Sequence, residues 1–151
     1  KLIARYPEGK QKSALIPLLL YAQDHFGGWL DTPVLDYVAS LLDILPIEVY
    51  EVVTFYTMFN LKPMGKHIFE VCQTGPCMVR GSEEIIEHIQ KRLGIGDGET
   101  TEDGLFSLKI VECLAACGYA PMMQLGKTYS EHLTTERIDE IIEEIRSKNA
   151  E

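Results

Sequence analysis

The first third of the chain carries apolar residues at the three- and four-residue spacing of amphipathic helices. One set runs over 15–26 and ends at Gly27-Gly28. A second follows Asp31-Thr32-Pro33, which supplies a cap and a first-turn proline, and a third covers 46–59. The pattern predicts a small N-terminal helical bundle, followed by a proline- and glycine-bearing linker at 60–66.

The second half alternates between strand and helix patterns. A β-rich run at 67–72 precedes a helix that we expect Ser82 to cap, and an alternating run at 106–113 predicts a second strand, so that both strands end on a cysteine. A hairpin about Gly126-Lys127 and a last helix capped by Thr135 follow. The order β-α-β and then β-β-α is that of a thioredoxin-like fold.

We therefore predict an α/β protein in two parts, an N-terminal helical domain over 1–62 and a C-terminal thioredoxin-like domain over 63–151. With 151 residues, 46% of them hydrophobic, the chain can bury a substantial core without disulfides. No apolar run approaches the roughly 20 residues of a membrane helix, so we expect no direct membrane span. Within the helical part we expect Phe55 in the core and leave Tyr56 open as a docking residue.

Charge narrows the choice of partner. The net charge is −9, and the acidic excess lies in two segments, 83–103 and 131–151. Nucleic-acid binding depends on clustered Lys and Arg, so this balance argues against a nucleic-acid partner. The simplest interpretation of the two segments is the solvated outer faces of two helices.

The candidate chemistry lies in four cysteines, which form two close pairs, Cys72 with Cys77 and Cys113 with Cys117. Thiolates are the ligands that iron-sulfur centres require, and two pairs can give each iron of a 2Fe-2S cluster two sulfur ligands. Parallel strands joined by a right-handed crossover bring their carboxyl ends to one edge, so the predicted fold would assemble pairs that 35 residues separate.

The loops that carry the cysteines suit such a site. Gly75 lets the backbone approach closely and Pro76 stiffens the loop, so that exposed amides there could hydrogen-bond cluster sulfur. If the segment 113–117 forms a helical turn, its two sulfurs lie on one face and could chelate one iron.

Other thiol chemistries compete with this interpretation. Structural zinc also takes four thiolates, although the small apolar residues around both pairs favour a compact, shielded cluster. Two disulfides fit poorly because nothing marks a small secreted scaffold, and a thioredoxin-type redox pair would need Cys-x-x-Cys. No Cys-His pairing of a Rieske centre occurs, since the four histidines are isolated: His25, His67, His88 and His132.

No catalytic constellation accompanies the cysteines. The glycine run at 94–98 lacks the last glycine of a dinucleotide fingerprint and follows a helix rather than a strand, so we interpret it as a turn. No Walker loop, nucleophile elbow or paired-carboxylate site is found. We therefore predict no catalytic residue and regard the chain as a carrier.

Several motifs together give the chain a close resemblance to a known family, the small peripheral 2Fe-2S subunit of NADH:quinone oxidoreductase, respiratory complex I. The resemblance covers nearly the whole chain. It implies a thioredoxin-like 2Fe-2S ferredoxin domain behind a helical extension, with Cys72, Cys77, Cys113 and Cys117 as cluster ligands. One departure is Ala115, where relatives often have glycine. The motifs are Val49 through Phe59, the Cys72 pair with Arg80-Gly81, Gly98-Glu99-Thr100-Thr101 with Asp103-Gly104, and Cys113-Leu114 through Ala120-Pro121.

The resemblance also implies partners and a role. The subunit would be a one-electron carrier, not catalytic by itself, whose cluster exchanges electrons with FMN on an NADH-binding partner subunit, with a larger iron-sulfur subunit as a further partner. It would be cytoplasmic and peripheral to the inner membrane, on the matrix side if mitochondrial. Equivalent subunits of NAD-linked hydrogenases or formate dehydrogenases remain alternatives, and a zinc-stabilised interaction module is the alternative from a different class.

Overall fold

The structure is a computed structural model that describes residues 1–149. The chain divides into two compact units, Lys1–Met64 and Gly65–Glu151. In the first unit, two short 3-10 helices, Ile3–Arg5 and Gln11–Ala14, precede three α-helices, α1 (Leu15–His25), α2 (Thr32–Leu42) and α3 (Pro46–Phe55). These helices share one apolar core, as the periodicity of the sequence indicates.

The start of α2 confirms the predicted cap. The Val34 N–H donates to the Asp31 carboxylate at 3.0 Å, and a proline occupies the first turn. An N-cap side chain of this kind satisfies one of the N–H groups that a helix leaves without an intrahelical partner.

The prediction for Phe55 is wrong. Its side chain is 76% exposed, whereas Phe59, beyond the end of the helix, is buried. The buried face of α3 contains Val49 and Val53. Phe55 stands two residues after Val53, about 200° around the helix, so it projects from the opposite face.

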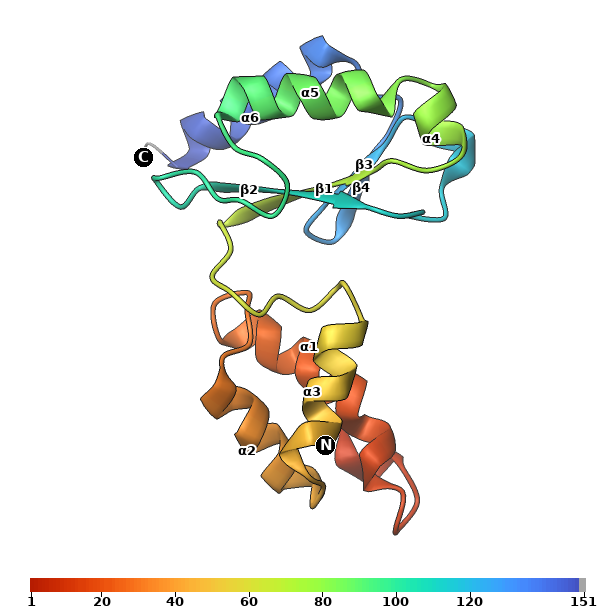
Figure 1. Cartoon of the computed structure of the whole chain (residues 1–151), viewed down its shortest axis with the longest axis vertical. Coiled ribbons are helices and arrows are strands. Elements are labelled where there is room, and N and C mark those ends of the chain that lie inside the picture. The colour runs from red at the N-terminus through yellow and green to blue at the C-terminus, as the bar shows by residue number, and fades with distance from the viewer. Residues whose placement is uncertain (150–151) are drawn as a thin grey trace. The chain divides into compact units, whose positions relative to one another are not determined.

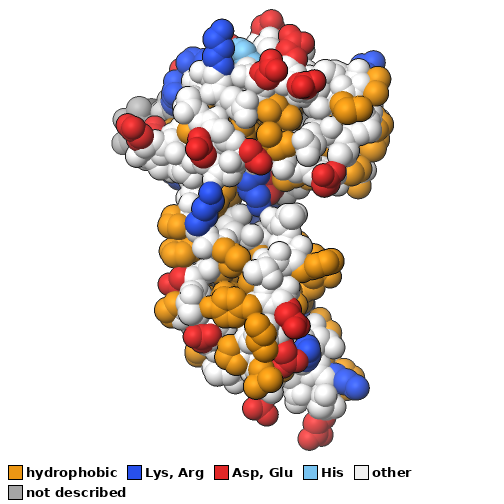
Figure 2. Space-filling view, viewed as in Figure 1, with side chains coloured by type: hydrophobic (Ala, Val, Ile, Leu, Met, Phe, Trp, Pro, Cys, Tyr) orange, Lys and Arg blue, Asp and Glu red, His pale blue; other side chains and the backbone are white. Residues whose placement is uncertain are grey.

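The surface of the first unit carries many apolar side chains (Figure 2). A surface rich in large apolar residues is typical of a protein that packs against another molecule. The exposed large hydrophobic residues of this unit are Leu20, Tyr21, Phe26, Tyr37, Leu41, Leu45, Ile47, Phe55, Tyr56, Met58 and Leu61.

The second unit is a mixed sheet with helices on one face (Figure 1). Its strands lie in the order β2-β1-β3-β4, with β1 and β2 parallel and the other neighbours antiparallel. Helices α5 and α6 pack together with the sheet around one core. The elements are β1 (His67–Cys72), α4 (Pro76–Val79), α5 (Ser82–Leu93), β2 (Phe106–Val111), the 3-10 helix η3 (Cys117–Tyr119), β3 (Met123–Leu125), β4 (Thr128–Ser130) and α6 (Thr135–Asn149).

A close backbone contact lies just before β1. A Cβ atom at Gly65 would come within 2.6 Å of the Phe106 carbonyl carbon, so only glycine fits there. The Gly65 N–H donates to the buried Ser107 hydroxyl at 2.7 Å. These contacts join the start of β1 to the start of β2, where His67 pairs with Phe106.

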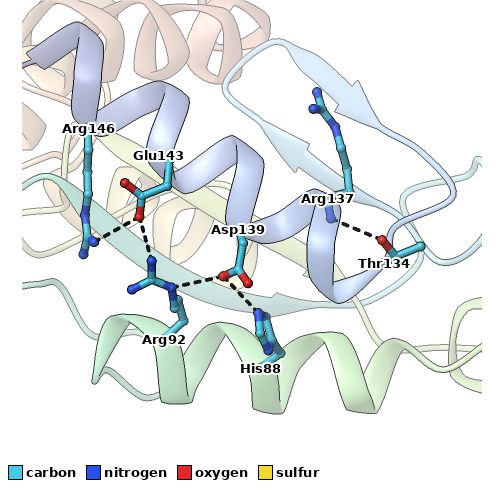
Figure 3. Close-up of polar contacts among 7 residues, drawn as sticks. All are labelled: His88, Arg92, Thr134, Arg137, Asp139, Glu143 and Arg146. Atoms are coloured by element: carbon cyan, nitrogen blue, oxygen red, sulfur yellow. Dashed lines mark hydrogen bonds and ion pairs between the residues drawn. The ribbon is translucent and has the colours of Figure 1, made fainter.

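The outer faces of α5 and α6 are joined by charged side chains (Figure 3). Arg92 bonds the carboxylates of Asp139 and Glu143, at 3.0 and 2.6 Å, and His88 contacts the same Asp139 at 3.1 Å. Each exposed ion pair of this kind contributes little to the stability of the fold. The acidic residues of α6 thus lie on a solvated face, as the sequence indicates.

The helices can also be compared with a membrane span. Within residues 1–149, no helix has the length and apolar content to cross a membrane.

Four predicted element ends differ from the structure. The third helix, predicted to extend to 59, ends at Phe55. The strand β2 ends at Val111, two residues before Cys113, because the chain turns into a loop there. Ser82 does not cap α5, since it is the buried first residue of that helix after Gly81. At α6 the cap is Thr134 and not Thr135, because the Thr134 hydroxyl accepts the Arg137 N–H at 3.2 Å (Figure 3).

The cap of α6 gives a matched test. We expect Thr134→Ala to lower the free energy of unfolding of the second unit by about 1 kcal/mol, because it leaves an N-terminal N–H of α6 without its partner. Thr135→Ala, one residue along, removes the same atoms but leaves that hydrogen bond intact. It should change the free energy of unfolding little. Chemical denaturation of both variants checks this, and an equal loss in the two would contradict the assignment of the cap.

Candidate iron-sulfur site

The two cysteine pairs follow neighbouring parallel strands. Cys72 is the last residue of β1 and pairs in register with Val111, the last residue of β2. The chain therefore leaves both strands at the same edge of the sheet, and Cys113 follows two residues later. The prediction that Cys72 and Cys113 lie close together at this edge depends on this strand pairing.

The first pair is almost completely buried, with Cys72 2% and Cys77 1% exposed. Between them the backbone turns at Gly75, whose φ of 52° and ψ of −122° suit glycine. Pro76 then opens the four-residue helix α4, and Cys77 is its second residue. The sulfurs lie in a small apolar cluster with Ala120 and Met122, apart from the main core of the unit.

The second pair is exposed. The Cys113 and Cys117 sulfurs are 3.9 Å apart, close enough to share one metal ion or one proton. The segment between them is not the helical turn considered from the sequence. Ala115 has a φ of +60°, in the left-handed region that favours glycine, and its N–H points at the Cys113 sulfur at 3.3 Å.

The loop of the second pair reaches the first pair. Leu114 packs against the apolar cluster of Cys72 and Cys77, and α4 packs against η3, which begins at Cys117. Over residues 1–149, no three His, Cys, Asp or Glu side chains converge tightly enough to enclose a single metal ion. Two thiol pairs on loops that leave one edge of the sheet are a donor set that a two-iron centre can use, and four thiolates also suit structural zinc.

The surroundings shift the acidity of the thiols in opposite directions. Burial raises the pKa of Cys77 to about 11, and its hydrogen bond with Cys72 adds to the rise. Burial also raises the pKa of Cys72, but hydrogen bonds with the Thr74 and Leu114 backbone outweigh burial and lower it. The hydrogen bond with the Cys113 sulfur raises the pKa of Cys117. When one of two close thiols is deprotonated, its negative charge makes deprotonation of the other unfavourable. A bound cation would offset the two negative charges and so allow both thiols to lose their protons.

One residue beside the site was not predicted. The Tyr129 hydroxyl, on β4, donates to the Leu114 carbonyl at 2.8 Å. The contact joins residues 15 apart in sequence, and the local pattern of β4 marks Tyr129 only as a strand residue. The one available signal was its place in the predicted hairpin next to the cysteine loop.

Comparison with known proteins bears on the same residues. A model of the thioredoxin-like 2Fe-2S ferredoxin family matches residues 1–146. An NADH-quinone oxidoreductase subunit of Rickettsia bellii (strain RML369-C) is 47% identical over 146 residues, which are 97% of this chain and 87% of that one. The mitochondrial NADH dehydrogenase (ubiquinone) flavoprotein 2 of Dictyostelium discoideum is 46% identical over 147 residues, which are 97% of this chain and 60% of that one.

A solved structure is also similar. An NAD+-reducing NiFe-hydrogenase in the air-oxidized state matches 86% of this chain with a TM-score of 0.74 at 22% identity, and the match spans 23% of the hydrogenase chain. At that identity the likeness concerns the fold. Together with the family match, it confirms the predicted thioredoxin-like fold class.

The difference in burial between the pairs predicts an order of thiol reactivity. In metal-free protein kept without oxygen, we expect brief iodoacetamide treatment to modify Cys113 first, because it is exposed. Cys117 is exposed too but should follow, since its pKa is raised, and Cys72 and Cys77 should react only after unfolding. Peptide mass spectrometry measures the order, and equal early modification of all four cysteines would contradict the described burial.

Proposed function

The chain belongs to the thioredoxin-like 2Fe-2S ferredoxin family, and from this premise we propose that Cys72, Cys77, Cys113 and Cys117 hold one 2Fe-2S cluster. The observation that carries the proposal is that both cysteine loops leave the sheet at one edge, where Leu114 of the second loop packs against the small apolar cluster that holds Cys72 and Cys77. Each pair then supplies both protein ligands of one iron. Soft thiolates in a small apolar pocket suit this group.

The cluster, when bound, accepts and returns one electron, and the chain's own residues determine how well it is held. Cys72 and Cys77, with Ala120 and Met122, exclude water from one side. The Ala115 N–H directs a hydrogen bond at the Cys113 sulfur, which stabilises negative charge there. The exposed pair leaves the opposite side open to a partner's redox group.

The relatives named as NADH-quinone oxidoreductase subunits support a specific role. We propose that the chain is the one-electron carrier subunit of an NADH:quinone oxidoreductase, exchanging electrons with FMN on an NADH-binding partner. A larger iron-sulfur subunit would be a further partner. The apolar surface of the first unit supports membership of an assembly, because such surfaces usually pack against another chain. The complex would lie at a membrane, with this subunit on its NADH-facing side, cytoplasmic or matrix.

The glycine run at 94–98 supports placing NADH on a partner. Gly94 closes the carboxyl end of α5 with a φ of 69°, and Gly98 turns the loop with a φ of 70°. Phosphate groups bind at helix amino ends, where N–H groups point outward, and the carboxyl end carries the opposite partial charge. The run is therefore a helix cap and turn, as the sequence indicates.

The equivalent subunit of an NAD-linked hydrogenase is the second candidate, and the similar hydrogenase structure is what favours it. Identities of 43–47% to several NADH-quinone oxidoreductase subunits, against 22% to that hydrogenase, weigh for the quinone-reducing assembly.

Metal analysis tests the cluster directly. Protein purified without oxygen should contain about two irons and about two acid-labile sulfides per chain and be red-brown. About one zinc per chain without sulfide would support a zinc-stabilised interaction module instead and overturn the proposal.

The carrier role predicts a dependence on a partner. Dithionite should reduce the cluster of the isolated chain and give an electron paramagnetic resonance signal, whereas NADH should give none, because the electrons must pass through FMN on another subunit. With the FMN-bearing subunit bound, NADH should produce the signal if the cluster's potential permits. NADH turnover by the isolated, flavin-free chain with an artificial acceptor would refute the carrier role.

A further inference from the structure

Tyr129 lies outside the cysteine motifs, yet it contacts the loop between Cys113 and Cys117. It stands on β4, where it pairs with Gln124 of β3, which in turn pairs with Glu70 of β1. Side chains at directly paired positions share one face of a sheet, and along β1 the side chains alternate between faces. Phe69 and Val71 point into the core beneath α5 and α6, so Tyr129 shares the other face with Cys72.

The hydroxyl of Tyr129 binds one particular peptide group. Its acceptor is the Leu114 carbonyl, at 2.8 Å, and the N–H of the same peptide unit belongs to Ala115. That N–H donates to the Cys113 sulfur at 3.3 Å. The peptide is trans, so its C=O and N–H point in opposite directions, and a bond that fixes one end also fixes the other.

The loop needs such a fixed point because its conformation is strained. Ala115 has a φ of +60°, which costs any residue with a Cβ atom some stability, and Cys113, two residues earlier, is exposed to solvent. A tyrosine held by strand pairing is a stiffer anchor than a group on another loop. A hydrogen bond to the carbonyl also polarises the peptide and strengthens its N–H as a donor.

We propose that Tyr129 is a positioning residue for the cluster site, holding the Leu114–Ala115 peptide so that its N–H stays directed at the Cys113 sulfur. The inference rests on the proposed function, since it concerns the cluster that Cys113 helps to hold. Hydrogen bonds to ligand sulfur offset the negative charge gained on reduction. Tyr129 therefore favours the reduced state of the bound cluster and slows loss of the cluster.

The chain offers a matched control for Tyr129→Phe. Tyr119 ends η3, two residues after Cys117, and is 50% exposed against 49% for Tyr129. Its ring packs against His132 with a centroid distance of 5.8 Å, and in the part of the chain that the structure describes its hydroxyl makes no hydrogen bond. Tyr119→Phe thus removes the same oxygen, near the same site, without touching the Leu114–Ala115 peptide.

The test compares cluster-loaded wild type, Tyr129→Phe and Tyr119→Phe. We expect Tyr129→Phe to shift the equilibrium constant for reduction about threefold toward the oxidised form, the factor that weakening one modest hydrogen bond supports. Redox titration followed by electron paramagnetic resonance measures it, and cluster release to a chelator should also be faster. Tyr119→Phe should match the wild type in both, and identical behaviour of the two variants overturns the proposal.

A second measurement does not depend on the cluster. In the metal-free protein, the Ala115 amide should exchange its hydrogen faster in Tyr129→Phe than in Tyr119→Phe, as followed by nuclear magnetic resonance, and unchanged exchange also overturns the proposal. The outcomes separate the two hypotheses. A wild-type chain without iron and sulfide defeats the proposed function, whereas a loaded wild type with two equivalent variants defeats only the role of Tyr129.

Discussion

The parallel pairing of β1 with β2 is the constraint on which the rest of the site depends. It places Cys72 opposite Val111, so that both cysteine loops leave the sheet at one edge. Register matters as much as pairing, because a slip of one residue would turn every side chain of β1 to the other face. Cys72 would then point toward the core of α5 and α6, away from the small cluster that it shares with Cys77, Ala120 and Met122. The close approach of Gly65 to Phe106, where no side chain fits, fastens the other end of the same pair of strands.

The two thiol pairs divide the requirements of an electron carrier between them. The pair on β1 and α4 is buried and the pair on the loop after β2 is exposed. In the proposed cluster site, the buried pair would keep water from two of the ligands, and the exposed pair would leave the other side open to a redox partner. The division follows from the fold, since α4 holds Cys77 back against the sheet while the segment 112–116 runs over its edge without regular structure.

The loop that carries the exposed pair shows how a sheet can control irregular backbone. Left-handed backbone at Ala115 is a conformation that the chain would not choose by itself. Two contacts hold the loop: the Tyr129 hydroxyl on β4 donates to the Leu114 carbonyl, and the Leu114 side chain packs against the cluster that contains Cys72 at the end of β1. Rigid strands thereby determine where the amides of an irregular segment point, which a functional site on a loop requires.

The sequence by itself determined the kind and order of the elements and the chemistry of the site. Helical spacing identified α1 to α3, strand alternation identified β1 and β2, and two cysteine pairs in small apolar flanks indicated iron and sulfur. These features are local, because propensity, periodicity and ligand type act within a few residues. The motifs also pointed to the family that the relatives show.

Only the tertiary structure decided which of the apolar and polar groups meet. Periodicity places Phe55 about 200° from Val53, but only the fold shows that α3 ends at Phe55 and that Phe59, beyond its end, is buried. Thr134 and Thr135 are chemically equal, and the exact first turn of α6 selects the cap. The burial of one cysteine pair, the turn at Ala115 and the contact of Tyr129 with Leu114 join segments far apart in sequence. Such contacts are fixed by the packing of whole strands and helices, which no local pattern records.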